Sequence, residues 1–266
     1  MKYFYLYKIL IKMETENNIE KIEKKKYKLI ILIIASRGGV YNIFMDHWNK
    51  YMNTRDDIRS FFVFGQGQET KDNHLESFSN VSIIAPFEET FVPGILQKTV
   101  HSYGYIDEHF DYDYIMRTNL SSMYDINQLS VFIDNLPKTG LYCGERRVLP
   151  AFDFISGSCF ILSKDIVKLL LENVNDINFS CIDDCSIALL MKKLNIPITS
   201  NMTSVSQPIN NITIYDNSKN INYFYYYRMR ALIYTEYDQN IKQRELEDRV
   251  NIDGEIAKKI YSLIYG

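Results

Sequence analysis

One uninterrupted apolar run, Lys28–Ala35, constrains the fold of this chain more than any other feature. It is rich in isoleucine, and Ser36-Arg37-Gly38-Gly39 ends it abruptly. A strand covered on both faces is apolar throughout, whereas a strand with one face in water alternates apolar and polar residues. The run is also far shorter than the roughly 20 residues that a transmembrane helix needs. It therefore predicts a strand inside a parallel sheet that has helices on both faces.

Strand and helix patterns alternate along the chain after this run. In chain order they predict a helix around Trp48, strands at Ser60–Phe64 and Val81–Ala85, a helix over Ile95–His109, strands at Tyr112–Thr118, Leu141–Val148 and Phe154–Leu162, and helices over Lys164–Asn173 and from Asp183 to Pro197. Such alternation is typical of βαβ units, in which ligands bind beyond the carboxyl ends of the strands. We expect one α/β, Rossmann-like domain with a mostly parallel central sheet. Ser36–Gly39 and Asn119–Ser122 should lie at its ligand-binding edge.

The two ends of the chain differ in composition from this predicted domain. Glu14–Lys28 is an acidic and then basic polar run with little apolar periodicity, so residues 1–27 are predicted to be a flexible polar leader. The segment Tyr223–Tyr261 has a helical pattern with many aromatic residues. We therefore predict a domain over residues 28–222 and a C-terminal helical extension, residues 223–266, packed on it.

Charge and motif content disfavour several classes of protein. The 30 basic and 33 acidic side chains give a net charge of -3, which offers no broad attraction to nucleic acid or to anionic membranes. The turn Ser36–Gly39 is neither the dinucleotide fingerprint nor a P-loop, which disfavours a dehydrogenase or a kinase-like ATPase. The sequence has no clear signal peptide or transmembrane segment, and a glycan on the Asn119 sequon would obstruct the predicted site. We therefore expect a cytoplasmic protein.

Two adjacent carboxylates, Asp183 and Asp184, stand at the start of a predicted helix. An aspartate there accepts hydrogen bonds from free backbone N–H groups and complements the helix dipole, so a capping role explains one of them. A single cap does not account for the second carboxylate, which must point elsewhere. Small residues on a neighbouring predicted strand, Ser156-Gly157-Ser158, would leave room for a ligand. The pattern is therefore consistent with a general base.

Several weak motifs follow one another in a family-like order. They are a strand, Ser-Arg-Gly turn and helix over Leu29–Trp48, the stretch Ile95–Thr99, the glycine-serine strand and helix of Ser156–Leu170, and the acidic segment Cys181–Ser186 followed by Leu189–Pro197. Together they resemble the β-1,3-galactosyltransferase and fringe families of glycosyltransferases. The resemblance implies a GT-A fold, a nucleotide-sugar donor with UDP as the expected nucleotide, and a glycan or protein acceptor.

The chain departs from the family pattern at the end of the strand near Tyr112–Thr118. Those families have an Asp-x-Asp triplet there that holds a divalent metal against the nucleotide diphosphate, whereas this chain has Asn119-Leu120-Ser121. An amide, an isobutyl group and a hydroxyl do not supply the anionic oxygens that magnesium and manganese prefer. Asp111-x-Asp113 stands before the strand and not at its end. We therefore assign no metal ligands, and the resemblance does not carry metal dependence over to this chain.

Positive charge must still offset the charge that a diphosphate gains as it leaves. Arginines or helix N-termini could supply it. Arg37 follows the first strand and Arg117 precedes the Asn-Leu-Ser turn, so these two are the nearest candidates. Arg228 and Arg230, on the predicted C-terminal helix, are mobile candidates.

These observations predict a glycosyltransferase that acts with inversion and uses Asp184 or Asp183 as general base. The residues expected to bind the nucleotide sugar are Ser36, Arg37, Lys98, Arg117, Asn119, Ser121, Ser156 and Gly157. Two other functions stay open at this point. One is a catalytically degenerate nucleotide- or sugar-binding protein, which would have lost its chemistry together with the acidic triplet. The other is an α/β interaction scaffold that binds no nucleotide.

Overall fold

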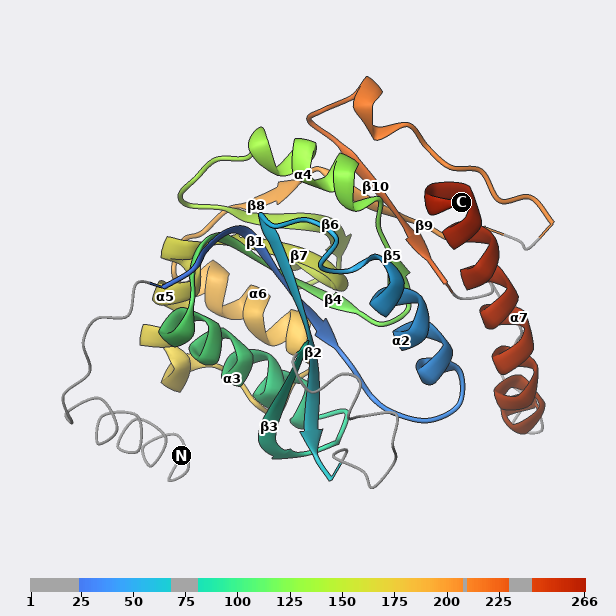
Figure 1. Cartoon of the computed structure of the whole chain (residues 1–266). Coiled ribbons are helices and arrows are strands. Elements are labelled where there is room, and N and C mark those ends of the chain that lie inside the picture. The colour runs from blue at the N-terminus through green and yellow to red at the C-terminus, as the bar shows by residue number, and fades with distance from the viewer. Residues whose placement is uncertain (1–23, 68–80, 208–209, 230–240) are drawn as a thin grey trace.

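The computed structural model describes residues 24–67, 81–207, 210–229 and 241–266, with side chains left out for 241–249. A seven-stranded sheet in the order β3-β2-β1-β4-β7-β6-β8 forms its centre (Figure 1). The strands are β1 (Lys26–Ile34), β2 (Ile58–Gln66), β3 (Ser82–Glu88), β4 (Asp111–Asn119), β6 (Tyr142–Val148), β7 (Asp153–Ser163) and β8 (Ile198–Ser200). Pairing is parallel except that β7 runs antiparallel to β4 and β6. The mostly parallel, Rossmann-like α/β sheet predicted from the sequence is confirmed.

Helices cover both faces of this sheet. One face carries α2 (Val40–Tyr51), α4 (Ile126–Asp134) and α7 (Ile241–Tyr265), and the other carries α3 (Gly94–His109), α5 (Lys164–Glu172) and α6 (Asp183–Lys193). The alternate residues of β1 belong to the two different cores: Leu29, Ile31 and Ile33 to the first, and Ile30, Leu32 and Ile34 to the second. Burial on both faces is the reason that this strand is apolar throughout.

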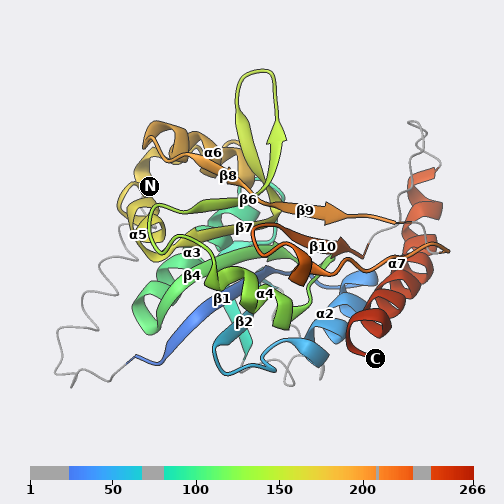
Figure 2. The ribbon, with the colours of Figure 1, turned by 90° about the horizontal axis from the view of Figure 1, so that it is seen from above.

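A second, three-stranded sheet lies beside the first and was not predicted. It contains β5 (Ser122–Met123), β10 (Phe224–Arg228) and β9 (Met202–Val205), in the order β5-β10-β9. Figure 2 shows β10 between α4 and α7, and the rings of Phe224 and Phe132 of α4 are 5.4 Å apart. The predicted helix from Tyr223 is therefore wrong for residues 224–228. Phenylalanine and tyrosine favour strands, and β10 pairs with β9 on one side and with β5 on the other.

Other departures from the sequence prediction are local. Strand β1 begins at Lys26, two residues inside the predicted leader, and residues 1–23 of that leader lie outside the described residues. Helix α4 and the short strands β8 and β9 had no strong pattern in the sequence. Asp111 and Asp113 lie in the first residues of β4, at the amino end of the strand, where Asp111 pairs with Lys164.

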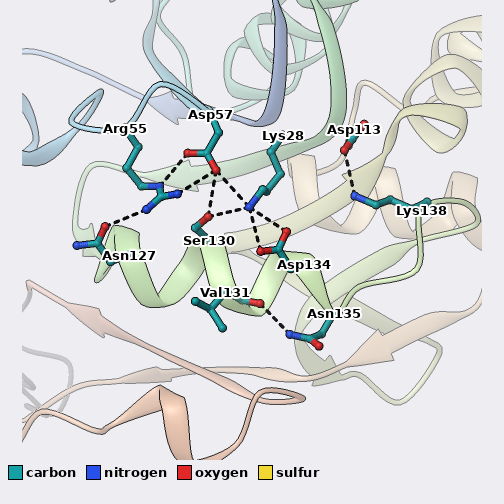
Figure 3. A network of polar contacts seen from close by, with 10 residues as sticks. All are labelled: Lys28, Arg55, Asp57, Asp113, Asn127, Ser130, Val131, Asp134, Asn135 and Lys138. Atoms are coloured by element: carbon teal, nitrogen blue, oxygen red, sulfur yellow. Dashed lines mark hydrogen bonds and ion pairs between the residues drawn. The ribbon is translucent and has the colours of Figure 1, made fainter.

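A network of charged side chains joins β1, β2 and α4 at the amino edge of the sheet (Figure 3). The Nζ atom of Lys28 lies 2.8 Å from a carboxylate oxygen of Asp134 and 3.2 Å from one of Asp57. Arg55 donates to Asp57 at 2.8 Å, and Ser130 of α4 joins the same group. Arg55 and, to a lesser extent, Lys28 lower the pKa of Asp57 to about 2. Every charge in this amino-edge network therefore has a partner of opposite sign.

Candidate functional site

The candidate site lies at the carboxyl edge of the same sheet, where four elements meet. In the parallel pair β1 and β4, Ile34 stands opposite Asn119, so Ser36 and Asn119 leave the sheet at neighbouring positions. Strand β7 runs back along β4 with Cys159 opposite Thr118, which brings Ser156 and Gly157 beside the end of β4. Helix α6 begins at Asp183 against this end of β7. Topology thus brings together segments that are far apart in the sequence.

Arg117 connects the end of β4 to the start of α6. It is only 2% exposed, and it donates from Nη1 to the side-chain oxygen of Asn119 at 2.8 Å. Its Nη2 atom forms an ion pair with Asp183 at 2.6 Å, and Asp183 is also buried. Among the described residues the Nε atom of Arg117 has no hydrogen-bond partner. A buried guanidinium with a carboxylate partner fixes the position of both segments, because separating the pair would leave an uncompensated buried charge.

Asp184 differs from Asp183 in its surroundings. Its Oδ2 atom accepts a hydrogen bond from the backbone N–H of Gly157 at 3.0 Å, and its Oδ1 atom accepts from the N–H of Cys185 at 2.9 Å. Burial and, next, the charge of Asp183 raise the pKa of Asp184, although the two N–H groups and Arg117 oppose the shift. Asp184 stays partly exposed. It is a carboxylate with increased basicity that a ligand can reach, which suits a general base.

Gly157 is required by the closeness of these groups. A Cβ atom at this position would lie 3.0 Å from Nη1 of Arg117 and 3.3 Å from Oδ2 of Asp184. Ser156 and Ser158 on either side share a hydrogen bond between their hydroxyls at 2.9 Å. The small residues therefore allow strand β7 to approach both the arginine and the carboxylate, and Ser156 is partly exposed at this edge.

Hydrogen bonding to free N–H groups at the helix start accounts for only one contact of the two aspartates, the bond that Asp184 Oδ1 accepts from Cys185. The N-cap residue of α6 is Ile182, which makes no side-chain capping hydrogen bond. Asp183 and Asp184 both lie in the first turn, where their charge complements the helix dipole. Asp183 pairs with Arg117 and Asp184 binds a different strand through Gly157. Each carboxylate thus has a distinct tertiary contact.

Lys98 and Ser36 meet at a carboxylate that the sequence did not single out, Glu89. The Lys98 side chain is 1% exposed and donates to both carboxylate oxygens of Glu89, at 2.5 and 2.8 Å, and to the carbonyl of Ala35 at 2.8 Å. The Ser36 hydroxyl donates to the same carboxylate at 2.9 Å. Glu89 also accepts from the N–H of Gly65, so it joins the ends of β1, β2 and α3.

The Lys98–Glu89 pair and the Arg117–Asp183 pair act on each other electrostatically. Burial lowers the pKa of Lys98 and Glu89 opposes this, and Arg117 and Asp183 contribute smaller effects of opposite sign. The ammonium of Lys98 pairs with Glu89, and Glu89 also accepts from Ser36. Lys98 therefore positions the turn that contains Ser36. The acidic pair Glu88-Glu89 before a predicted helix was the one signal in the sequence that could have found Glu89.

The turn that carries Ser36 continues into Arg37 and two glycines. Gly38 and Gly39 have φ values of 91° and 53°, a region that residues with a Cβ atom rarely adopt. The Arg37 guanidinium lies over the ring of Phe64, 5.1 Å from its centroid, and the side chain is partly buried. Arg37 is therefore at the carboxyl edge, on the β2 side.

Hydrogen bonds hold the Asn119–Ser121 turn from two sides. Trp48 donates from its indole to the carbonyl of Leu120 at 3.0 Å. Arg228, at the end of β10, donates to the hydroxyl of Ser121 at 2.9 Å, and the N–H of Met229 donates to the Ser121 carbonyl. Arg228 therefore reaches the predicted site, whereas Arg230 lies outside the described residues.

These contacts also test whether the turn could hold a divalent cation. The side-chain oxygen of Asn119 accepts from Arg117, and that of Ser121 accepts from Arg228. Two guanidinium groups at the only oxygen-bearing side chains of the turn repel a cation, and neither oxygen is anionic. Elsewhere in residues 24–67, 81–207, 210–229 and 241–266, no three His, Cys, Asp or Glu side chains gather in a way that could hold a metal. The turn residues do not fit a metal site.

Comparison with known proteins adds one match. A family model described as galactosyltransferase matches residues 136–202, which include β6, β7, α5, α6 and β8. The match contains Ser156, Gly157 and both aspartates, but not Arg117 or Asn119. No curated protein matches the sequence. The match supports a galactosyltransferase-like region and glycosyltransferase activity in general, which implies a nucleotide-sugar donor and an acceptor. Within the described residues, no helix has the length and apolar character needed to cross a bilayer.

Proposed function

We propose that the protein is a hexosyltransferase that moves a sugar from a nucleotide-diphosphate donor, a UDP-sugar, to an acceptor hydroxyl with inversion at the anomeric carbon. The observation that carries the proposal is the convergence at the carboxyl edge of the sheet. There an accessible carboxylate of raised pKa, Asp184, lies beside the buried ion pair of Arg117 and Asp183, and the partly exposed Arg228 of β10 reaches the turn that follows β4. The galactosyltransferase match over α6 and β7 is independent support.

Asp184 is the general base in this proposal. An acceptor hydroxyl transfers its proton to the Asp184 carboxylate while its oxygen attacks the anomeric carbon from the face opposite the diphosphate. The bond from that carbon to the diphosphate oxygen breaks, and its electron pair leaves with the nucleoside diphosphate. Asp183 is assigned a different role, because its charge is committed to Arg117 at 2.6 Å. It positions the arginine and the first turn of α6.

Arginines stabilise the leaving diphosphate. Charge accumulates on the diphosphate oxygens as the bond breaks, and donors already in place are more effective than solvent. Arg228 is partly exposed and lies against Ser121 at the turn. Arg117 is buried near the end of β4 and donates to Asn119. Arg228 is therefore the residue that makes direct contact in this proposal, and Arg117 positions the turn.

The remaining predicted residues form the walls of the donor site. Ser36 and Arg37, on the turn after β1, contact the nucleotide, and Asn119 and Ser121 lie under the ribose or diphosphate. Ser156 and Gly157 leave space for the transferred sugar beside Asp184. UDP is assigned because the chain resembles the β-1,3-galactosyltransferase and fringe families. Lys98 and Glu89 keep the Ser36 turn in place.

The test is a transfer assay with purified full-length protein, a panel of UDP- and GDP-sugars, and EDTA in half of the reactions. We expect turnover of a UDP-sugar that EDTA leaves unchanged, because the turn offers no anionic oxygens to a metal. Loss of all activity in EDTA would overturn the arginine assignment. Arg228→Ala should lower kcat by about 10²-fold, as removal of one charge-stabilising donor does. The matched control is Arg146→Ala, an exposed arginine on β6.

A non-catalytic nucleotide-binding protein is the alternative, and the loss of the acidic triplet is the observation in its favour. In that case UDP would raise the melting temperature, but no sugar would be transferred or hydrolysed. An interaction scaffold would show neither response.

A further inference from the structure

A hollow beside the candidate site has not been used so far. Its volume is about 820 Å³, within the size range of small-molecule sites. One wall is formed by Gln66 at the end of β2, by the end of β3, by the loop into α3 and by Gln97 of α3. The other wall is the 3-10 turn Val174–Asp176 and the residues up to Phe179, just before α6. The hollow therefore lies on the face of the sheet that α3, α5 and α6 cover.

Both walls belong to segments that hold the candidate site. Glu88 and Thr90 line the hollow, and Glu89 between them binds Lys98 and Ser36. On the opposite wall, the carbonyl of Asn178 accepts a hydrogen bond at 2.7 Å from the hydroxyl of Ser186, which is two residues after Asp184 in α6. A ligand in the hollow would thus touch the same loop that positions the Ser36 turn and the segment that leads into the base-bearing helix.

The lining has a chemical character that differs from that of the donor site. Four side-chain amides face it, from Gln66, Gln97, Asn175 and Asn178. An amide both donates and accepts, so it can bind a hydroxyl in either orientation. The described lining residues include Glu88 but no lysine, arginine or histidine, so the hollow offers a phosphate or another anion no cationic side chain to pair with.

Apolar surface completes the lining. The side chains of Phe87 and Phe179 lie on opposite walls, together with prolines. Val92, on the loop between β3 and α3, also lines the hollow and is 37% exposed. The two phenylalanine rings beside uncharged amides suit a ligand that has hydroxyl groups at its edges and C–H groups on its faces, and a saccharide has both.

We propose that this hollow binds the acceptor, an uncharged oligosaccharide, with the reacting hydroxyl directed toward the start of α6. The identification of this saccharide as the acceptor rests on the proposed function, but the binding of a neutral saccharide can be measured independently of that function. It adds a substrate class to the site, since the amides and the absence of cations select a neutral glycan over a phosphorylated or sulfated one.

Binding is measured first, by NMR titration of the full-length protein with lactose, cellobiose and chitobiose, and with glucose 6-phosphate and sulfated lactose as anionic counterparts. We expect the neutral saccharides to bind and the anionic ones to bind at least tenfold more weakly. Gln97→Ala and Phe179→Ala should each weaken binding about tenfold, which corresponds to the loss of one good hydrogen bond or ring contact. Asn135→Ala, an exposed amide at the end of α4, is the matched control and should bind as the unchanged protein does. Equal binding by all variants, or binding to no neutral saccharide, overturns the proposal.

Donor turnover then separates the two proposals. In the presence of a UDP-sugar, Gln97→Ala and Phe179→Ala should raise the acceptor KM about tenfold and leave hydrolysis of the donor by water unchanged. Neutral saccharides that bind without any donor turnover would refute the proposed function and leave the saccharide site standing. Donor turnover with an acceptor KM that the two variants leave unchanged would refute the acceptor site alone. The melting temperature of each variant identifies a variant that fails to fold. Gln97→Glu then takes the place of that variant, because the added negative charge should weaken the binding of an anionic saccharide further.

Discussion

The two edges of the central sheet use the same kinds of charged residue in different ways. At the amino edge, Lys28, Arg55, Asp57 and Asp134 are partly exposed, each has a partner of opposite sign, and the pKa of Asp57 is lowered to about 2. At the carboxyl edge, Arg117 and Asp183 are buried as a pair, and the neighbouring Asp184 has a raised pKa. The amino edge satisfies its charges, and the carboxyl edge keeps one carboxylate that is incompletely compensated. Carboxylates whose pKa is shifted by burial and a neighbouring charge cluster at functional sites, so the carboxyl edge is the stronger candidate of the two.

The two edges should differ most in how strongly a substitution lowers turnover. Asp184→Asn should lower kcat by about 10²- to 10⁴-fold, because the amide cannot accept the acceptor proton. The measurement is a steady-state transfer assay with the UDP-sugar that the unchanged protein uses. Asp57→Asn at the amino edge is the control and should retain its kcat. Turnover by Asp184→Asn at the rate of the unchanged protein would show that the base assignment is wrong.

Breaking the buried ion pair should give the largest change in stability. Arg117→Ala leaves Asp183 buried without its partner, and we expect the free energy of unfolding to fall by about 3–5 kcal/mol. Chemical denaturation measures this value. In the double variant Arg117→Ala with Asp183→Asn, the uncompensated charge is gone, so part of the stability should return. If the two changes are simply additive, the pair is not coupled and does not hold α6 to β4.

The pH dependence of the two edges should differ in sign. The pKa of Asp184 is raised above 3.8, so kcat/KM should fall as the pH drops through that raised pKa and Asp184 becomes protonated. Since the folded state holds this proton more tightly than the unfolded state, the contribution of Asp184 to stability is lost as the pH rises through the same range. A pH profile of kcat/KM from about pH 3 to about pH 9, a range that includes the ordinary aspartate pKa of about 4, checks the first statement. An acid limb at or below that ordinary pKa would contradict it.

Asp57 should behave in the opposite way, with the smallest effect. Its pKa is lowered from 3.8 to about 2, so its contribution to stability is present above the unfolded value and is lost as the pH falls toward 2. Asp57→Asn should lower the free energy of unfolding by about 1 kcal/mol at neutral pH, since the pairs are partly exposed to solvent. The difference between variant and unchanged protein should shrink between about pH 4 and pH 2. A difference that is constant with pH would mean that the ion pairs contribute nothing.

Much of the fold could be predicted because its signals are local. The apolar run of β1 and the alternation of strand and helix predicted the sheet, and the positive φ values at Gly38 and Gly39 agree with a sharp turn there. The segment 224–228 was mistaken for helix because five residues rich in tyrosine do not separate the two periods. Strand β10 exists because β9 and β5 pair with it, and neither strand was evident in the sequence.

The sequence predicted the types of residue at the candidate site better than it predicted their contacts. Adjacent aspartates at a helix start and small residues on a strand are visible in one dimension, and the structure brings Asp183, Asp184 and Gly157 together. Glu89 was missed, because its importance comes from Lys98 and Ser36, which meet it only in the folded chain. The roles of these residues stay predictions for the experiments above.

The sequence by itself determined the class of fold and predicted the carboxyl edge as the place for a ligand, because strand burial and chain alternation follow from local patterns of apolar residues. Only the tertiary structure decided which of the two aspartates pairs with Arg117 and which stays accessible. It also decided that Arg228 reaches Ser121 from more than a hundred residues away. The physical reason is that burial and charge compensation depend on neighbours in space, and those neighbours come from segments whose separation along the chain carries no information about their contact.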